Sequence, residues 1–169
     1  RISPRRVFSK LGAMQKAYRA SLLRFDSAGL AVFDTDGLLV VGPNAAGVQV
    51  VQAVGPYSTV APQYPGIATE HLPGRIIAPG FVDMHIHYPQ TDVIGAPAEG
   101  LLPWLENYTF PHEKRFSAPD YAADVATFFI AELLRNGVTT ALTFATSHPT
   151  SVHALFAQAQ HHHMRLITG

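Results

Sequence analysis

The feature that most constrains the fold is an alternation of strand-like and helix-like segments from Arg75 to the end of this 169-residue chain. Apolar and β-branched runs cover residues 76–87, 138–144 and 164–168, and helical patterns cover residues 117–136 and 150–161. Alternation at this spacing is typical of parallel βαβ units with right-handed crossovers. The sequence therefore predicts an α/β segment of three parallel strands and two helices over residues 75–169.

The first predicted helix carries signals at both ends. Ser117 is the predicted N-cap, Pro119 falls in the first turn, and Asp120 follows the cap by three residues. Asn136-Gly137 predicts the end of the helix. Before this helix, residues 91–116 predict a long loop that contains the only tryptophan, Trp104. Loops that follow the carboxyl end of a strand often contribute to a site. Trp104 therefore either packs beneath the loop or contacts a ligand.

The residues before Arg75 predict a small, partial β-sandwich-like domain over residues 20–74. Strand-sized apolar runs lie at 22–25, 30–33, 38–41 and 48–54. Asp34-Thr35-Asp36-Gly37 separates two of them and predicts a hairpin turn, because glycine accepts the positive φ that such turns require. Prolines and glycines punctuate the passage from residue 56 to Gly74, where this domain is expected to end.

We expect residues 1–19 to be a basic leader or extension. Seven of the twelve lysines and arginines precede Asp26, the first acidic residue. An acid-free segment rich in arginine is typical of an organelle transit peptide. The alternative is a vector leader or an upstream extension that precedes a natural start at Met14.

Composition excludes several classes of function. The chain has no cysteine, which removes disulfides, thiolate nucleophiles and cysteine-ligated zinc sites. Its formal net charge is zero, so nucleic acid is not an expected partner. Its apolar runs are shorter than the roughly 18 residues that a membrane span needs. We therefore expect a cytoplasmic protein that binds neither nucleic acid nor membranes.

The segment Phe81–His87 holds the strongest chemical signal. Alternate side chains of a strand share a face, so His85 and His87 should point the same way, with Met84 and Ile86 on the opposite, apolar face. Two neutral imidazoles on one side can bind one Zn, Fe, Cu or Ni ion. Because His-x-His is weak evidence alone, its position in an apolar strand after Pro79-Gly80 matters.

The residues from Pro79 to His87 resemble the first-strand motif of the amidohydrolase superfamily. Within it, the chain is similar to the guanine deaminase family at Tyr88-Pro89-Gln90, at 101–105, at 108–113, at 129–140 and at His148-Pro149. The resemblance implies the first three strands and two helices of a partial (β/α)8 barrel. It also implies zinc-dependent hydrolysis of guanine to xanthine and ammonia, in a full-length enzyme that is a homo-oligomer.

The resemblance also assigns roles to individual residues. His85 and His87 match two zinc ligands, and Gln90 matches a side chain that hydrogen-bonds the purine. The segment His87, Tyr88, Pro89 and Gln90, together with Trp104, is expected to line the substrate pocket. The remaining metal ligands and the proton-shuttling carboxylates have no counterpart, so no catalytic residue beyond the metal ligands is expected here and the chain alone should be inactive.

Two alternatives stay open. A related amidohydrolase could act on another amino-purine, a triazine or a cyclic amide. An inactive, truncated chain could instead serve as an interaction module, with its open sheet edges covered by a partner.

Overall fold

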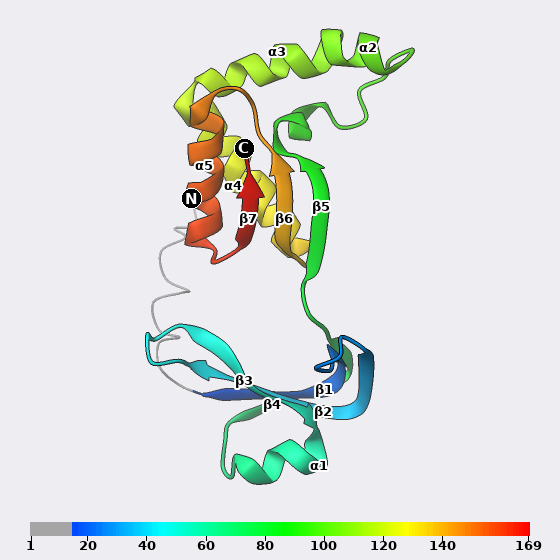
Figure 1. The fold of residues 1–169 in the computed structure, drawn as a ribbon, viewed down its shortest axis with the longest axis vertical. Coiled ribbons are helices and arrows are strands. Elements are labelled where there is room, and N and C mark those ends of the chain that lie inside the picture. The colour runs from blue at the N-terminus through cyan, green and yellow to red at the C-terminus, as the bar shows by residue number, and fades with distance from the viewer. Residues whose placement is uncertain (1–14) are drawn as a thin grey trace. The chain divides into compact units, whose positions relative to one another are not determined.

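The computed structural model describes residues 15–169 and divides into two compact units, one ending at Pro79 and the other starting at Gly80 (Figure 1). The basic leader predicted for residues 1–19, with the possible start at Met14, lies mostly outside the described residues.

The first unit is a four-stranded sheet with strand order β3-β2-β1-β4. Strand β1 (Lys16–Phe25) pairs antiparallel with β2 (Ala31–Pro43) and parallel with β4 (Thr69–Ile77), and β3 (Gln49–Pro56) pairs antiparallel with β2. Between β3 and β4 the chain forms the short helix α1 (Tyr57–Val60) and the 3-10 turn η1 (Ala61–Gln63). Val60 of α1 packs on buried residues of β1 and β2, and this contact forms a small core.

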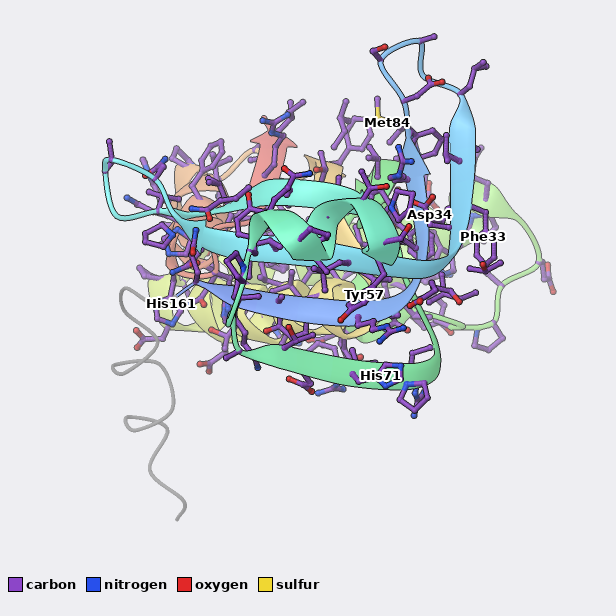
Figure 2. All side chains as sticks on the ribbon, turned by 90° about the horizontal axis from the view of Figure 1, so that it is seen from below. Phe33, Asp34, Tyr57, His71, Met84 and His161 are labelled. Atoms are coloured by element: carbon purple, nitrogen blue, oxygen red, sulfur yellow. The ribbon has the colours of Figure 1, made fainter. Side chains whose placement is uncertain are left out.

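The hairpin turn predicted at Asp34–Gly37 is wrong, because these residues lie inside the continuous strand β2. The register with β1 shifts here: Ala20 pairs with Gly37 but Leu22 pairs with Asp34, so one residue of β1 opposes two of β2. Figure 2 shows β2 bending sharply near the labelled Asp34. The segment therefore forms a β-bulge.

Side-chain contacts between the two strands explain the bulge. Arg24 Nε donates to Asp34 at 2.7 Å, and Arg19 donates two hydrogen bonds to Asp36. Gly37 is needed for space, since a Cβ there would lie 2.4 Å from Cγ of the buried Leu22. Local sequence does not reveal these partners, so an Asp-Gly pattern by itself predicts a turn.

The turns at the two ends of β2 are stabilised by the same kind of side-chain to backbone hydrogen bonds. The side-chain oxygen of Asp26 accepts hydrogen bonds from the backbone N–H groups of Ala28 and Leu30. Asn44 does the same two and four residues on, at the other end of the strand. A glycine with positive φ completes each turn, Gly29 at 79° and Gly47 at 77°.

The second unit confirms the predicted alternation of strands and helices. Strands β5 (Phe81–His87), β6 (Val138–Phe144) and β7 (Arg165–Thr168) form a parallel sheet in the order β5-β6-β7. The crossovers are α4 (Pro119–Arg135) and α5 (Pro149–His161), which lie on one face of the sheet in Figure 1. Buried residues of both helices and of β6 form the larger core with Tyr88 and Phe116.

The long loop predicted between the first strand and α4 is largely helical. After the 3-10 turn η2 (Tyr88–Val93) the chain forms successive short helical segments: α2 (Leu101–Trp104), the π-helical η3 (Leu105–Thr109), α3 (Phe110–Glu113) and the 3-10 turn η4 (Lys114–Ser117). Pro111 lies at the start of α3, directly after the π-helical η3, so this proline stands within a continuous helical stretch. Figure 1 shows α2 and α3 beyond the arrowheads of the strands.

The boundaries of α4 confirm one prediction and correct another. Gly137, with φ of 81°, directly follows the helix and its C-cap Asn136, as predicted. Ser117 is not the N-cap: its hydroxyl donates to the carbonyl of Lys114 at 2.9 Å, and Ala118 takes the cap position. Ser117 is thus used to end the preceding 3-10 turn. Within residues 15–169, no helix is both long and apolar enough to cross a bilayer.

Candidate metal-binding site

His85 and His87 converge at the carboxyl end of β5. Their Nε2 atoms lie 3.3 Å apart, and the ring centroids are separated by 5.1 Å. The strand is irregular here, because its register against β6 shifts between Asp83 and Ile86, so that Met84 and His85 lie opposite the single residue Leu142. Asp83 stabilises this irregularity by accepting a hydrogen bond from the backbone N–H of His85 at 3.0 Å. The two imidazoles nevertheless face each other on one side of the strand.

The prediction that Met84 and Ile86 share an apolar face of the strand is wrong for Met84. Ile86 packs against the larger core as expected, but the Met84 side chain, labelled in Figure 2, remains 64% exposed. Strict alternation would have placed both on one face. The irregularity between Asp83 and Ile86 includes Met84 and His85 and breaks that alternation, and regular pairing resumes at Ile86 and His87.

Phe144 is part of the site, although sequence reasoning missed it. It ends β6 and pairs in register with His87. Its ring stacks on the His87 imidazole, with centroids 4.7 Å apart and planes 15° apart, and it contacts the His85 ring at 5.1 Å. The available signal was its position: in a parallel sheet the last residues of adjacent strands meet at one edge. Phe144 therefore supports both imidazoles from the neighbouring strand.

Gln90 approaches the pair from η2. Its amide nitrogen lies 3.3 Å from Nδ1 of His87, so the His87 ring has a neighbour at each nitrogen. Burial lowers the pKa of His87, and the charge of His85 lowers it further. Both effects favour the neutral imidazole, the form that binds metal ions.

Tyr88 and Pro89 directly follow His87 in the chain, and their side chains have almost no exposed surface. The Tyr88 hydroxyl donates to the backbone carbonyl of Ala122 in α4 at 2.6 Å, and its ring packs edge-on against Phe116. Burial raises the pKa of Tyr88 far above its ordinary value. These side chains attach the segment to the core and present no polar group to solvent.

Trp104 is half-buried on α2. Among residues 15–169, no hydrogen bond or ring contact joins it to the two histidines. The structure therefore brings together His85, His87 and Gln90 and leaves Trp104 apart.

The imidazole pair fits a zinc ion by its spacing. Zinc binds imidazole nitrogens at about 2.0–2.1 Å in a tetrahedral arrangement, which places two such nitrogens about 3.3 Å apart. The two Nε2 atoms show this separation. Within the described part of the chain, no third His, Cys, Asp or Glu joins them in a group that could hold a metal. The pair is thus half of a tetrahedral ligand set.

The first unit offers a different kind of hollow. A space of about 380 Å³ is lined mainly by apolar side chains of β1, β2 and β3, including Leu22, Leu39 and Val54. Its one charged lining residue, Arg24, is paired with Asp34. This hollow lacks groups for metal binding or acid–base chemistry.

A parallel α/β unit with paired imidazoles at the carboxyl end of a strand defines the class: an α/β protein with a candidate metal centre at that edge of its sheet. The chain belongs to the amidohydrolase family, whose sequence profile matches residues 76–169.

Similar proteins narrow the comparison. The chain is 46% identical over 138 residues to guanine deaminase from Escherichia coli, covering 81% of this chain and 30% of that protein. The crystal structure of guanine deaminase from Bradyrhizobium japonicum matches with a TM-score of 0.83 and 36% identity, over 92% of this chain and 35% of that one. Guanine deaminase from C. acetobutylicum, solved with guanine in its active site, matches with a TM-score of 0.77 and 29% identity, over 92% and 36% of the two chains.

A more distant likeness shows the fold alone. An adenosine deaminase from Xanthomonas campestris, solved with bound zinc, matches with a TM-score of 0.62 and 24% identity, over 90% of this chain and 33% of that one. In all four comparisons the chain spans about a third of the relative's length.

Proposed function

We propose that this chain supplies the first part of the active site of a zinc-dependent guanine deaminase, which hydrolyses guanine to xanthine and ammonia. The observation that carries the proposal is the convergence of His85 and His87 at 3.3 Å. It occurs in a chain 46% identical to a guanine deaminase over 138 residues. In this proposal the second unit forms the first strands and helices of a (β/α)8 barrel, and β5 is the first barrel strand.

His85 and His87 would hold the zinc ion through their Nε2 atoms, which lie 3.3 Å apart. Zinc held there would activate water as a nucleophile by lowering its pKa toward neutrality. Phe144 keeps the His87 ring in one plane by stacking on it. Asp83 fixes the backbone of His85. The protein thus orients both imidazoles before a metal arrives, which reduces the cost of ordering them on binding.

Gln90 contacts the purine by hydrogen bonding, and the segment that contains it lines the pocket. Tyr88 and Pro89 contribute by holding this segment on the core, since neither side chain is exposed. Trp104 belongs to the helical connection beyond the carboxyl ends of the strands, the edge at which barrel enzymes bind their substrates.

The two imidazoles provide two of the four ligands of a tetrahedral zinc site. The rest of the ligand set and the groups that transfer protons come from the part of the relatives that this chain does not span. We therefore expect weak zinc binding and no deamination of guanine by residues 1–169 alone.

The test uses two proteins: residues 1–169, and the protein extended to the length of its relatives. Zinc added to the shorter chain should shift the NMR signals of the His85 and His87 rings, and His87→Asn should abolish the shift. Ammonia release from guanine should be measurable only for the extended protein, and His85→Asn should lower it by at least about 100-fold. Guanine deamination by residues 1–169 with stoichiometric zinc would contradict the division of the site. Full activity of the extended His85→Asn protein would contradict the role of the pair.

A further inference from the structure

Three side chains form a row of nitrogen atoms at the candidate site. The amide nitrogen of Gln90 lies 3.3 Å from His87 Nδ1, and His87 Nε2 lies 3.3 Å from His85 Nε2. Each of these contacts is a hydrogen bond only if one atom donates and the other accepts. A neutral imidazole has one donor and one acceptor nitrogen, so the direction of the first bond fixes that of the second.

With the amide nitrogen facing His87, the row runs in one direction. Gln90 donates to Nδ1, the proton of the neutral His87 ring resides on Nε2, and Nε2–H donates to His85 Nε2. In this direction His87 Nε2 carries a proton and has no free lone pair. The lone pair of His85 Nε2 accepts the hydrogen bond from that proton. The arrangement satisfies the hydrogen bonds of a metal-free pair and closes both nitrogens to a cation.

The opposite direction follows from turning one group. The oxygen and nitrogen of a glutamine amide have nearly the same shape, so a half-turn about the last side-chain bond exchanges them. With Oε1 facing His87, Nδ1–H donates to Gln90 and the proton leaves Nε2. Both Nε2 lone pairs then point into the space between the two rings. This is the tautomer that metal-bound histidines adopt when their other nitrogen donates to an acceptor.

We propose that Gln90 is a positioning residue that sets the tautomer of His87, donating to Nδ1 in the metal-free site and accepting from Nδ1–H when the imidazole pair binds a divalent cation. The inference rests on the proposed zinc site and deepens it. In the second state the amide N–H that bonded His87 is released, so both N–H groups of Gln90 can donate to acceptor atoms of a bound ligand. Loading of the pair thereby adds a second amide donor that Gln90 can offer to the substrate.

The surroundings of Gln90 restrict it to this movement. Its backbone lies in η2, which hydrogen bonds fix on both sides: Tyr88 to Ala122, and the Tyr121 hydroxyl to Asp92 at 2.6 Å. Within the turn, Thr91 Oγ1 donates to the carbonyl of Tyr88 at 2.7 Å. The Gln90 side chain itself is only half-buried. The backbone is therefore held while the terminal amide has room to turn.

The His87 ring is restricted in a complementary way. Its stacking on Phe144, with planes 15° apart, opposes rotation of the ring about its own bonds. A ring flip would exchange Nδ1 with a carbon and lose the contact to Gln90. The proton can change from one ring nitrogen to the other while the Gln90 amide makes its half-turn. This exchange requires no displacement of the ring.

The experiment measures the His87 tautomer by long-range 1H–15N NMR of residues 1–169, at a pH about two units above the ordinary histidine pKa of about 6.5. The variants are Gln90→Leu, which can neither donate nor accept, and Gln90→Glu, whose carboxylate only accepts. Gln160→Glu, on an exposed position of α5, adds the same charge in the same unit and serves as the control. Each spectrum is recorded without metal and during titration with zinc chloride.

We expect the metal-free wild-type chain and the Gln160→Glu control to carry the His87 proton mainly on Nε2. Gln90→Glu should move it to Nδ1 without any metal. Gln90→Leu should weaken zinc binding by about 10-fold, the size expected for loss of a group that orients a ligand, and Gln90→Glu should restore it.

Two results would overturn the inference: a His87 tautomer that is the same in all four proteins, or zinc affinity that Gln90→Leu changes by less than about 2-fold. Failure of the proposed function looks different. If zinc shifts neither histidine ring, the metal site fails, but the metal-free spectra still decide whether Gln90 sets the tautomer.

Discussion

Replacing Tyr88 by phenylalanine tests the conclusion that this buried side chain holds the segment after His87 on the core. The change removes the hydroxyl that donates to Ala122 at 2.6 Å and keeps the ring, which packs on Phe116 and Phe129 with centroids 4.9 and 5.6 Å away. No cavity forms, and the Ala122 carbonyl retains its intrahelical bond. The loss is therefore that of one buried hydrogen bond, about 1–1.5 kcal/mol. Tyr88→Ala also removes the ring and should cost about 3–5 kcal/mol.

The assay is urea unfolding followed by tryptophan fluorescence. Trp104 is the only tryptophan and lies in the second unit, so its emission reports the unit that contains Tyr88. In thermal unfolding, Tyr88→Phe should lower Tm by roughly 3–8 °C. Tyr108→Phe is the matched control, because in the described chain that hydroxyl bonds no protein group, and it should change stability by less than about 0.5 kcal/mol.

Two outcomes would refute the reasoning. If Tyr88→Phe were as stable as the wild type, the hydroxyl would not be bound inside the core and would be free to contact a ligand. If Tyr88→Phe were as damaging as Tyr88→Ala, the ring contacts would contribute nothing, contrary to the packing against Phe116 and Phe129.

Two further predictions concern other parts of the chain. Gly37→Ala should destabilise the first unit by about 1–3 kcal/mol, because the new Cβ would lie 2.4 Å from a buried carbon of Leu22. Far-UV circular dichroism in urea measures this, with Gly100→Ala, which meets no atom within 4 Å, as the control; equal stability of the two variants would exclude the close approach. Burial, and then the hydrogen bond to Asp92, raises the pKa of Tyr121 to about 12, above the ordinary value of about 10. The neutral phenol therefore stabilises the fold fully below about pH 10, and this contribution is lost as pH rises through about 12. Tyr121→Phe should make the fall in unfolding free energy above pH 10 less steep, and an unchanged slope would contradict the assignment.

The second unit could be predicted well because its signals are local. A β-branched run marks Val138–Phe144, and Gly137 supplies the positive φ that ends α4. Ser117 was misassigned because a serine hydroxyl can serve either end of a helical turn, and only the observed bond to Lys114 decides between them.

The first unit was harder because its decisive contacts are distant in sequence. Asp34 and Asp36 stay within a strand through arginines 10 and 17 residues away. Their partners cannot be identified from an Asp-Gly pattern, which in isolation favours a turn.

The candidate site was predictable in part. Strand periodicity correctly indicated that His85 and His87 share a side, but not that their nitrogens lie 3.3 Å apart. The contact between Gln90 and His87 joins residues three apart, the spacing that one helical turn brings together, so a predicted turn after the strand would have revealed it. Phe144 required knowledge of which strand lies next to β5 and in what register.

The order β5-β6-β7 leaves one side of β5 without a partner strand in the described chain. Its backbone N–H and C=O groups on that side are open to a further parallel or antiparallel strand. A polypeptide that paired there would be aligned by main-chain hydrogen bonds alone, and its side chains would arrive beside the imidazoles at a spacing of about 4.8 Å. A strand paired with this edge would therefore place its own side chains next to His85 and His87.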